Sequence, residues 1–277
     1  MHDMARFRDA AVSWAAAGAD ADAAAEIARG LAGLVATVVL VEGQSDAVAV
    51  DTFAKRLGRD LELEHISVVP VGGATSVRRF LEPFGPAGLD LRLSGLVDAA
   101  EERFFRQAVQ GSDRHPELTR DEMEQLGFFV CVPDLEFELI RAIGTDRTIE
   151  VISEEGDARA LRSFRNQPAQ RARALEHQLH RFMGTTSGRK SRYAIALASA
   201  IDLSRMPVRS GHFSRSCERS APPGWEASLG QASVLSVVAP IPSSSLSRMR
   251  ASRNRDLSVP TGICRRAASS GPVSPSK

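Results

Sequence analysis

The sequence predicts an α/β protein with a central parallel sheet, and two observations support this class. Four short, uninterrupted runs of apolar and β-branched residues are typical of strands buried on both faces of a parallel sheet. Helical patterns alternate with these runs, as in proteins built from repeated β-then-α units. We therefore expect a three-layer fold, with helices before the sheet and a disordered tail after it.

Each element follows from its local pattern. Residues 1–34 are rich in alanine and have apolar residues at helical spacing, which predicts one or two helices interrupted near Gly18. The strands are expected where apolar runs stop at Gly, Asp, Glu or Pro: 37–41, 66–71, 91–97 and 127–132. Helices are expected at 45–57, at 75–82 with an end forced by Pro83, and at 135–143.

Charge is distributed unevenly along the chain. Residues 1–207 carry 25 basic and 31 acidic groups, a net charge of −6, whereas residues 208–277 carry ten basic and three acidic groups. The second segment also contains 17 Ser and 7 Pro without an apolar period, which predicts a disordered tail. An alternative explanation for the abrupt change in composition near Pro207 is out-of-frame translation of GC-rich coding DNA. The predicted organisation is a helical segment at 1–34, a folded domain at 35–207 and the tail.

Several classes of protein are excluded by composition. No apolar stretch approaches the roughly 20 residues that cross a bilayer, so no membrane partner is expected. The N-terminal stretch contains acidic residues in place of the apolar core of a signal peptide. Cys131, Cys217 and Cys264 lie far apart, without metal-ligand or disulfide spacing, which is typical of the reduced cytosol. We therefore expect a cytoplasmic protein.

Acidic residues follow three of the four predicted strands: Glu42, Asp98 and Asp134, with Glu136 close behind. The carboxyl ends of parallel strands meet at one edge of the sheet, where ligands bind, so we expect these side chains to converge. Grouped carboxylates repel one another unless a cation neutralises them, and hard oxygen ligands favour Mg²⁺ or Mn²⁺. The pattern predicts metal-dependent phosphoryl transfer. Taken alone, Asp134 is better explained as the cap of the following helix.

Asp46 lies four residues after Glu42, across the predicted turn from strand to helix. Both carboxylates could therefore face the same site. The alternative is that Asp46 only stabilises the first turn of the helix through the helix dipole.

The run Val39-Leu-Val-Glu-Gly-Gln-Ser-Asp46 resembles the opening motif of the TOPRIM domain. This catalytic fold is shared by type IA and II topoisomerases, bacterial primases and OLD-family (overcoming lysogenisation defect) nucleases. Further stretches, in the same order, resemble the OLD-type group: 69–74, 93–98, 132–136 and 188–193. The resemblance extends over residues 35–205 and implies a Rossmann-like TOPRIM fold with a helical C-terminal part.

The resemblance also implies roles for individual residues. Glu42 corresponds to the characteristic TOPRIM glutamate, a metal ligand or a general acid/base in the transfer. The implied metal ligands are Glu42, Asp46, Asp98, Asp134 and Glu136. Lys190 matches a lysine that offsets negative charge developing on the scissile phosphate. Taken alone, Lys190 is better explained as an exposed cation at the start of a helix.

One motif departs from the family pattern. The Asp-x-Asp pair of the family reads Asp98-Ala99-Ala100, so a second carboxylate is absent unless Glu101 or Glu102 substitutes for it. This departure puts two-metal catalysis in question.

Other candidate residues carry less weight. His177 and His180 lie three apart on a predicted helix, but no nearby Cys or further His completes a zinc set, so both are expected at the surface. Arg78 and Arg79 could bind DNA phosphate, although a solvated helix face explains them better.

The sequence thus predicts a cytoplasmic, Mg²⁺- or Mn²⁺-dependent endonuclease of OLD-like TOPRIM type acting on nucleic acid, with DNA the expected substrate. The alternative is a non-catalytic regulatory or binding module with a degenerate metal site. A third possibility is a truncated or frame-disrupted product with little activity. No Gly-x-x-x-x-Gly-Lys-Ser/Thr phosphate loop occurs in the chain, so any associated ATPase would be a separate polypeptide.

Overall fold

The computed structural model describes residues 2–110, 118–186 and 188–203, all of which belong to one compact unit. The segment predicted to be a disordered tail, residues 208–277, lies outside the described residues. Within the described ranges no helix combines the length and the apolar character needed to cross a bilayer.

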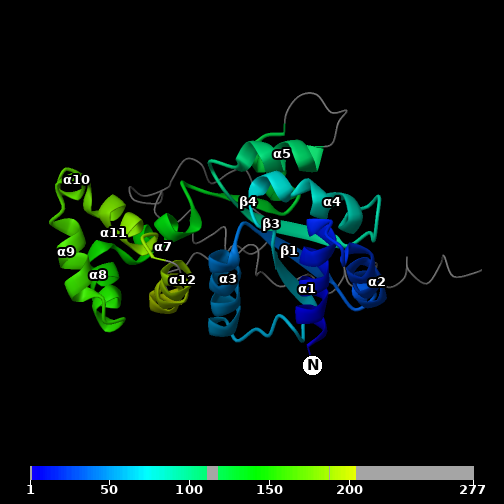
Figure 1. Cartoon of the computed structure of the whole chain (residues 1–277), viewed down its shortest axis with the longest axis horizontal. Coiled ribbons are helices and arrows are strands. Elements are labelled where there is room, and N and C mark those ends of the chain that lie inside the picture. Colours follow the sequence, from blue (N-terminus) through cyan, green and yellow to red (C-terminus); the bar gives the residue numbers. More distant parts are fainter. Residues whose placement is uncertain (1, 111–117, 187, 204–277) are drawn as a thin grey trace, which may run out of the picture. The chain divides into compact units, whose positions relative to one another are not determined.

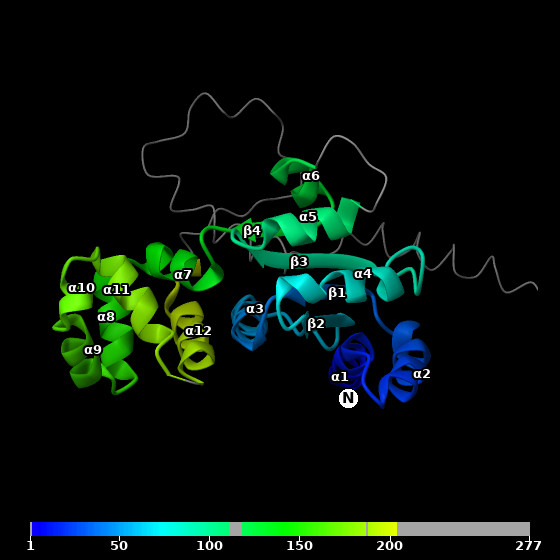
Figure 2. The ribbon, with the colours of Figure 1, turned by 45° about the horizontal axis from the view of Figure 1, so that its top comes forward.

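Four parallel strands form the central sheet, in the order β2-β1-β3-β4 (Figures 1 and 2). The strands are Thr37–Val41 (β1), Ile66–Pro70 (β2), Arg92–Asp98 (β3) and Phe128–Cys131 (β4). β1 lies between β2 and β3, with Thr37 in register with Ile66 on one side and Arg92 on the other. All five residues of β1 are buried, as the continuous apolar run predicted. The predicted parallel α/β class is therefore confirmed.

Twelve α-helices and one 3₁₀ turn surround the sheet in the described part of the chain. In chain order they are α1 (Asp3–Ala16), α2 (Ala21–Ala32), α3 (Gln44–Arg56), η1 (Ala74–Ser76), α4 (Arg78–Phe84), α5 (Glu102–Gln110), α6 (Arg120–Gln125), α7 (Leu135–Ile143), α8 (Thr145–Glu154), α9 (Ala158–Arg165), α10 (Pro168–Arg171), α11 (Leu175–Met183) and α12 (Arg189–Ala200).

Different helices pack on the two faces of the sheet. Val38 and Leu40 of β1 belong to an apolar core with α1, α4 and α5, and Phe7 and Phe84 pack there with ring centroids 5.6 Å apart. Val39 and Val41 point to the other face, into a core shared with α3, α7 and α12. The alternation of β1 side chains thus holds a helical layer on each face, as expected for a three-layer fold. In Figure 2, helices α7 to α12 lie together at one end of the sheet.

The prediction that the helix stops at Pro83 is wrong. The stretch forms η1 and then α4, which includes Pro83 and ends at Phe84. Proline lacks an N–H, but in the last turn of a seven-residue helix this removes only one hydrogen bond. Gly85 closes the helix by donating its N–H to the Leu81 carbonyl at 2.9 Å.

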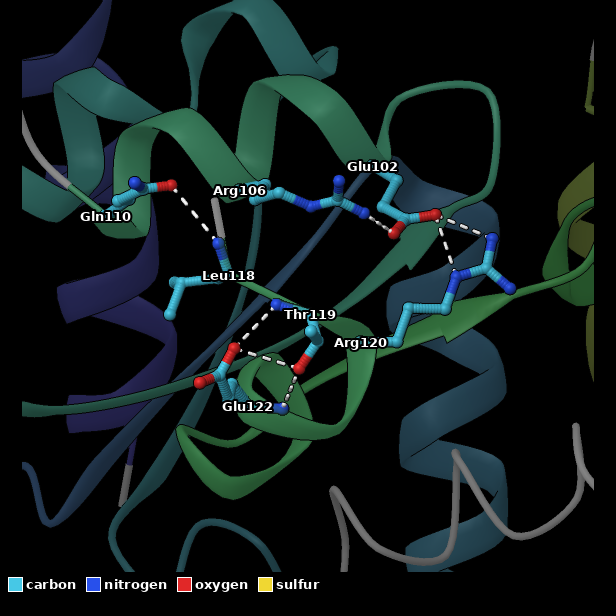
Figure 3. Close-up of polar contacts among 7 residues, drawn as sticks. All are labelled: Glu102, Arg106, Gln110, Leu118, Thr119, Arg120 and Glu122. Carbon is cyan, nitrogen blue, oxygen red and sulfur yellow. Dashed lines mark hydrogen bonds and ion pairs between the residues drawn. The ribbon is translucent and has the colours of Figure 1, made fainter. Parts of the chain in front are cut away.

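A buried ion cluster connects α5 to α6 (Figure 3). The Glu102 side chain is 10% exposed and accepts hydrogen bonds from Arg106, one turn later on α5, and from Arg120 on α6 at 2.9 and 2.6 Å. Thr119 caps α6, since its hydroxyl accepts the Glu122 N–H at 3.3 Å while the Glu122 carboxylate accepts the Thr119 N–H at 2.7 Å. The arginines hold the pKa of Glu102 below its ordinary value, with Arg120 the main cause.

Candidate active site

The first part of the candidate site is the turn from β1 to α3. Glu42 follows the last residue of β1, and its Oε2 atom is buried without a hydrogen-bond partner among the described residues. Asp46, in the first turn of α3, is buried and accepts the Gly43 N–H at 2.9 Å. Asp46 therefore stabilises the start of α3, as one interpretation of the sequence held. It also lies close enough to Glu42 for their charges to interact, as the other interpretation held.

Asp98 stands at the carboxyl end of the neighbouring strand, β3. The next residue, Ala99, donates its N–H to the carbonyls of Cys131 and Pro133 at 2.9 and 3.0 Å. These hydrogen bonds fix the turn after β3 against the turn after β4. They bring Asp98 within electrostatic range of both Glu42 and Asp134.

The turn from β4 to α7 supplies two further carboxylates. Asp134 caps α7 by accepting the Phe137 N–H at 2.8 Å, and its second oxygen lies 2.7 Å from Nε2 of His180. Glu136 is only 2% exposed, and its Oε2 atom accepts no hydrogen bond from a described residue. Lys190 on α12 forms an ion pair with the other oxygen, Nζ to Oε1 3.1 Å. One oxygen of this buried carboxylate thus has no donor.

The turn that carries Asp134 is itself held by a buried acid. Glu138 on α7 accepts the Val132 N–H at 2.8 Å. Burial raises the pKa of Glu138 to about 7. Its neighbour Cys131, fully buried at the end of β4, also has a raised pKa because of burial. Glu138 thus connects α7 to the turn after β4.

Asp157, just before α9, positions the first turn of α12, where Lys190 lies. Its carboxylate accepts the Tyr193 hydroxyl at 2.8 Å and forms ion pairs with Arg189 and Arg192. Tyr193 is fully buried, so this network is anchored in the core. Three neighbours of Lys190 are therefore fixed on Asp157, while Lys190 itself is directed to Glu136.

Electrostatic interaction among the carboxylates is strong. Burial, and next the charge of Glu136, raises the pKa of Asp46 to about 7. Burial, followed by hydrogen bonding and repulsion from Glu42, raises the pKa of Asp98 to about 9. Burial would lower the pKa of Lys190, but Glu136, Asp46 and Asp98 together raise it above its ordinary value. The cluster thus has an excess of negative charge that Lys190 alone does not neutralise.

Asp134 differs from the other acids. Burial by itself would raise its pKa, but hydrogen bonds from His180 and the Phe137 N–H hold that pKa below its ordinary value. In turn, the hydrogen bond to Asp134 raises the pKa of His180. Both oxygens of Asp134 are therefore already in use.

The expectation that His180 is a surface residue is wrong. Its side chain is 29% exposed and paired with Asp134, whereas His177 is exposed with its ring against Phe137 at 5.0 Å. His180 also lines a pocket of about 340 Å³. The other lining residues are Asp134, Glu136, Arg181, Met183, Gly184, Thr185 and Lys190. Sequence spacing along α11 gave no signal for this pairing, because Asp134 lies on a distant turn.

All six residues implied by the resemblance lie within electrostatic range of at least one other member of the set. In residues 2–110, 118–186 and 188–203, however, no three acidic, His or Cys side chains are arranged so that they could hold an ion as they stand. The donors nevertheless suit a divalent cation, because Glu42 and Glu136 present buried oxygens without hydrogen-bond donors. The residue types fit a hard metal ion, although their present arrangement is not a closed coordination shell.

Comparison with known families gives one match in the first half of the chain. Residues 35–99 match the family described as overcoming lysogenization defect protein-like, TOPRIM domain. This segment contains β1, α3, β2 and β3, and with them Glu42, Asp46 and Asp98. No curated protein gives a significant match.

Solved structures resemble a larger part of the chain. Two structures of the C-terminal region of the Xanthomonas campestris pv. campestris OLD protein are 26% and 25% identical to it. The first covers 74% of this chain and 93% of its own, with a TM-score of 0.50, and the second covers 78% and 97%, with a TM-score of 0.54. The likeness therefore extends beyond the matched segment.

Proposed function

Because the chain carries a TOPRIM domain of the OLD type, which supports a nucleic-acid-related function, we propose that it is a metal-dependent endonuclease that hydrolyses phosphodiester bonds, with DNA as substrate. The observation that carries the proposal is the group of buried carboxylates at the carboxyl edge of the sheet. Two of them, Glu42 and Glu136, have oxygens without hydrogen-bond donors. Such oxygens are costly to bury and are typical of a site that binds a cation.

The metal would be Mg²⁺ or Mn²⁺, held by Glu42, Asp46, Asp98 and Glu136. Asp134 is the weakest candidate ligand, because both of its oxygens already accept hydrogen bonds. When bound, the ion would supply Lewis acidity to the phosphate and a water of lowered pKa.

The protein's own residues would perform three tasks. Glu42 would accept a proton from the attacking water through the carboxylate oxygen that does not hold the metal. The water oxygen bonds to phosphorus as the bond to the leaving oxygen breaks, and that leaving oxygen takes a proton from solvent. Lys190, 46% exposed on the pocket wall, would stabilise negative charge on the phosphate oxygens. Asp157 would keep Lys190 in place by fixing the first turn of α12.

Cleavage assays with matched variants test the proposal. Glu42→Gln and Asp98→Asn should each reduce Mg²⁺- or Mn²⁺-dependent cleavage of plasmid DNA by about 100-fold or more, as loss of a group that stabilises the transition state does. Glu82→Gln and Asp51→Asn make the same chemical changes at exposed side chains, 63% and 48% accessible, and should leave cleavage unchanged. Equal cleavage by all four variants would place the activity elsewhere.

A non-catalytic binding module is the second candidate, favoured by Ala100 in place of the second aspartate and by the absence of a closed ligand set in the described residues. Calorimetric titration with Mg²⁺ and Mn²⁺ separates the two functions. A nuclease should bind at least one ion, and Asp98→Asn should abolish or weaken that binding. A binding module with a degenerate site should show no metal binding in either protein.

A further inference from the structure

Positive charge is concentrated in the helices that follow the α/β core. Residues 158–200, which span α9 to α12, contain nine Lys or Arg and one acidic residue, Glu176, a net charge of +8. Residues 1–157 contain 15 basic and 29 acidic groups, a net charge of −14. The near-neutral chain therefore consists of a strongly acidic part and a strongly basic part.

The basic side chains of the two parts differ in their partners. Nine basic side chains before residue 158 form ion pairs with carboxylates: Arg6, Arg8, Arg29, Lys55, Arg59, Arg78, Arg106, Arg120 and Arg147. Six arginines of α9, α10, α11 and the turn before α11 form no ion pair with any carboxylate of the described residues. They are Arg159, Arg162, Arg165, Arg171, Arg173 and Arg181, and all but Arg165 are exposed.

One of these arginines lies at the candidate active site, and the helices that carry the others pack together with its helix. Arg181 lines the same pocket as Glu136 and Lys190. α11, which carries Arg181, packs against α9, and α9 against α10. Eight of the nine basic residues in this region are arginines, whose planar guanidinium groups match the geometry of phosphate oxygens.

From these observations we infer that the exposed arginines of α9 to α11, here called the arginine surface, bind the phosphate backbone of duplex nucleic acid and deliver it to the pocket. The inference rests on the proposed action on nucleic acid. A backbone-binding surface is needed because the acidic part of the chain, with its net negative charge, repels a polyanion.

The aromatic residues of the same region favour a duplex over a single strand. Phe182 and Tyr193 are buried and Phe164 is partly buried, so none is exposed as a platform on which unpaired bases could stack. Binding of single strands usually combines basic grooves with such aromatic platforms. Arginines without exposed aromatic residues suit recognition through phosphates alone.

Two triple variants of the full chain, equal in charge, test the inference. In Arg159→Gln/Arg162→Gln/Arg173→Gln, three exposed arginines of the arginine surface are neutralised. In Arg6→Gln/Arg8→Gln/Arg29→Gln, three arginines that are 63%, 40% and 53% exposed elsewhere are neutralised. Affinity for a short DNA duplex and for its single strand is measured by fluorescence anisotropy with EDTA, over about 50 to 200 mM salt. Circular dichroism confirms that both variants fold.

The arginine-surface triple should bind duplex at least tenfold more weakly than the wild type. The slope of log affinity against log salt should fall by about 2.7, since each lost phosphate contact removes about 0.9. The control triple should keep the wild-type slope. Equal slopes for the two triples, or tighter binding of the single strand than of the duplex, would overturn the inference. So would a salt-sensitive oligomer that only the arginine-surface triple disrupts, if no duplex binds, because the partner would then be a second copy of the chain.

The test separates this inference from the proposed hydrolysis. Wild-type binding that depends on the arginine surface, without cleavage in Mg²⁺ or Mn²⁺, would support the surface and refute the nuclease. The opposite result is also possible: Glu42→Gln abolishes cleavage, but the arginine-surface triple binds duplex as tightly as the wild type. That result would support the nuclease and refute the arginine surface.

Discussion

Two groups of buried acids in this protein have opposite electrostatic surroundings. Glu102, on α5, accepts hydrogen bonds from two arginines, and its pKa is lowered. At the carboxyl edge of the sheet, Asp46 and Asp98 face other carboxylates, and their pKa values are raised to about 7 and about 9. A compensated acid stabilises the fold, whereas crowded acids lower stability in exchange for a site that attracts cations. The following predictions test this contrast, beginning with the largest effect.

Glu102→Gln should lower the free energy of unfolding by about 2 kcal/mol, because it removes the charge-assisted hydrogen bonds that Arg106 and Arg120 donate to a buried carboxylate. Urea unfolding followed by circular dichroism measures this loss. Glu150→Gln is the control: it breaks an exposed ion pair with Arg147 and should cost less than about 0.5 kcal/mol. Similar losses in the two variants would show that the cluster between α5 and α6 adds no special stability.

Asp98→Asn should raise the free energy of unfolding by about 1 kcal/mol at pH 8 in the presence of EDTA, because asparagine is neutral in both states and folding then no longer requires proton uptake at this position. The same variant should lose cleavage activity, so stability and function change in opposite directions. The exposed substitution Asp51→Asn serves as the matched control and should leave stability within about 0.5 kcal/mol of the wild type. A clear destabilisation by Asp98→Asn would mean that Asp98 is a structural residue.

The two groups should also respond to pH in opposite directions. The folded-state pKa of Asp98 is about 9 against an ordinary 3.8, so between these values the folded chain holds a proton that the unfolded chain has released. Its contribution to stability is therefore lost as pH rises through this window, with a slope of at most about 1.4 kcal/mol per pH unit. The lowered pKa of Glu102 gives stability that is present above its ordinary value of 4.5 and lost as pH falls through the folded-state pKa.

The free energy of unfolding, measured in EDTA from acid to alkaline pH, checks both predicted directions. Asp98→Asn should flatten the decline in stability between about pH 4 and pH 9. Glu102→Gln should reduce only the loss of stability as pH falls below the ordinary pKa of 4.5. If either substitution shifts the curve of unfolding free energy against pH without changing its shape, that residue does not cause the pH dependence assigned to it.

Much of the fold was predictable because the signals are local. The apolar run at β1 predicted a strand buried on both faces. The position of Asp98 at the end of β3, near Glu42, was predictable because parallel strands end at one edge. The end of α4 was not, because proline in a final turn costs too little to stop a short helix. The roles of His180 and Asp157 depend on partners that are distant along the chain. No spacing rule applied to a single helix could have found them.

The central position of β1 determines how the candidate site can move. Its backbone amides are hydrogen-bonded within the sheet on both sides, and its side chains are buried on both faces. Amide protons of such a strand exchange with deuterium only when the whole unit unfolds. Glu42 directly follows this strand, so we expect its backbone to keep the same position during catalysis. Lys190 lies on α12, which packs against α3 and, within the part of the chain that the structure describes, forms no hydrogen bond with the sheet, so we expect adjustment to a substrate on this side of the site.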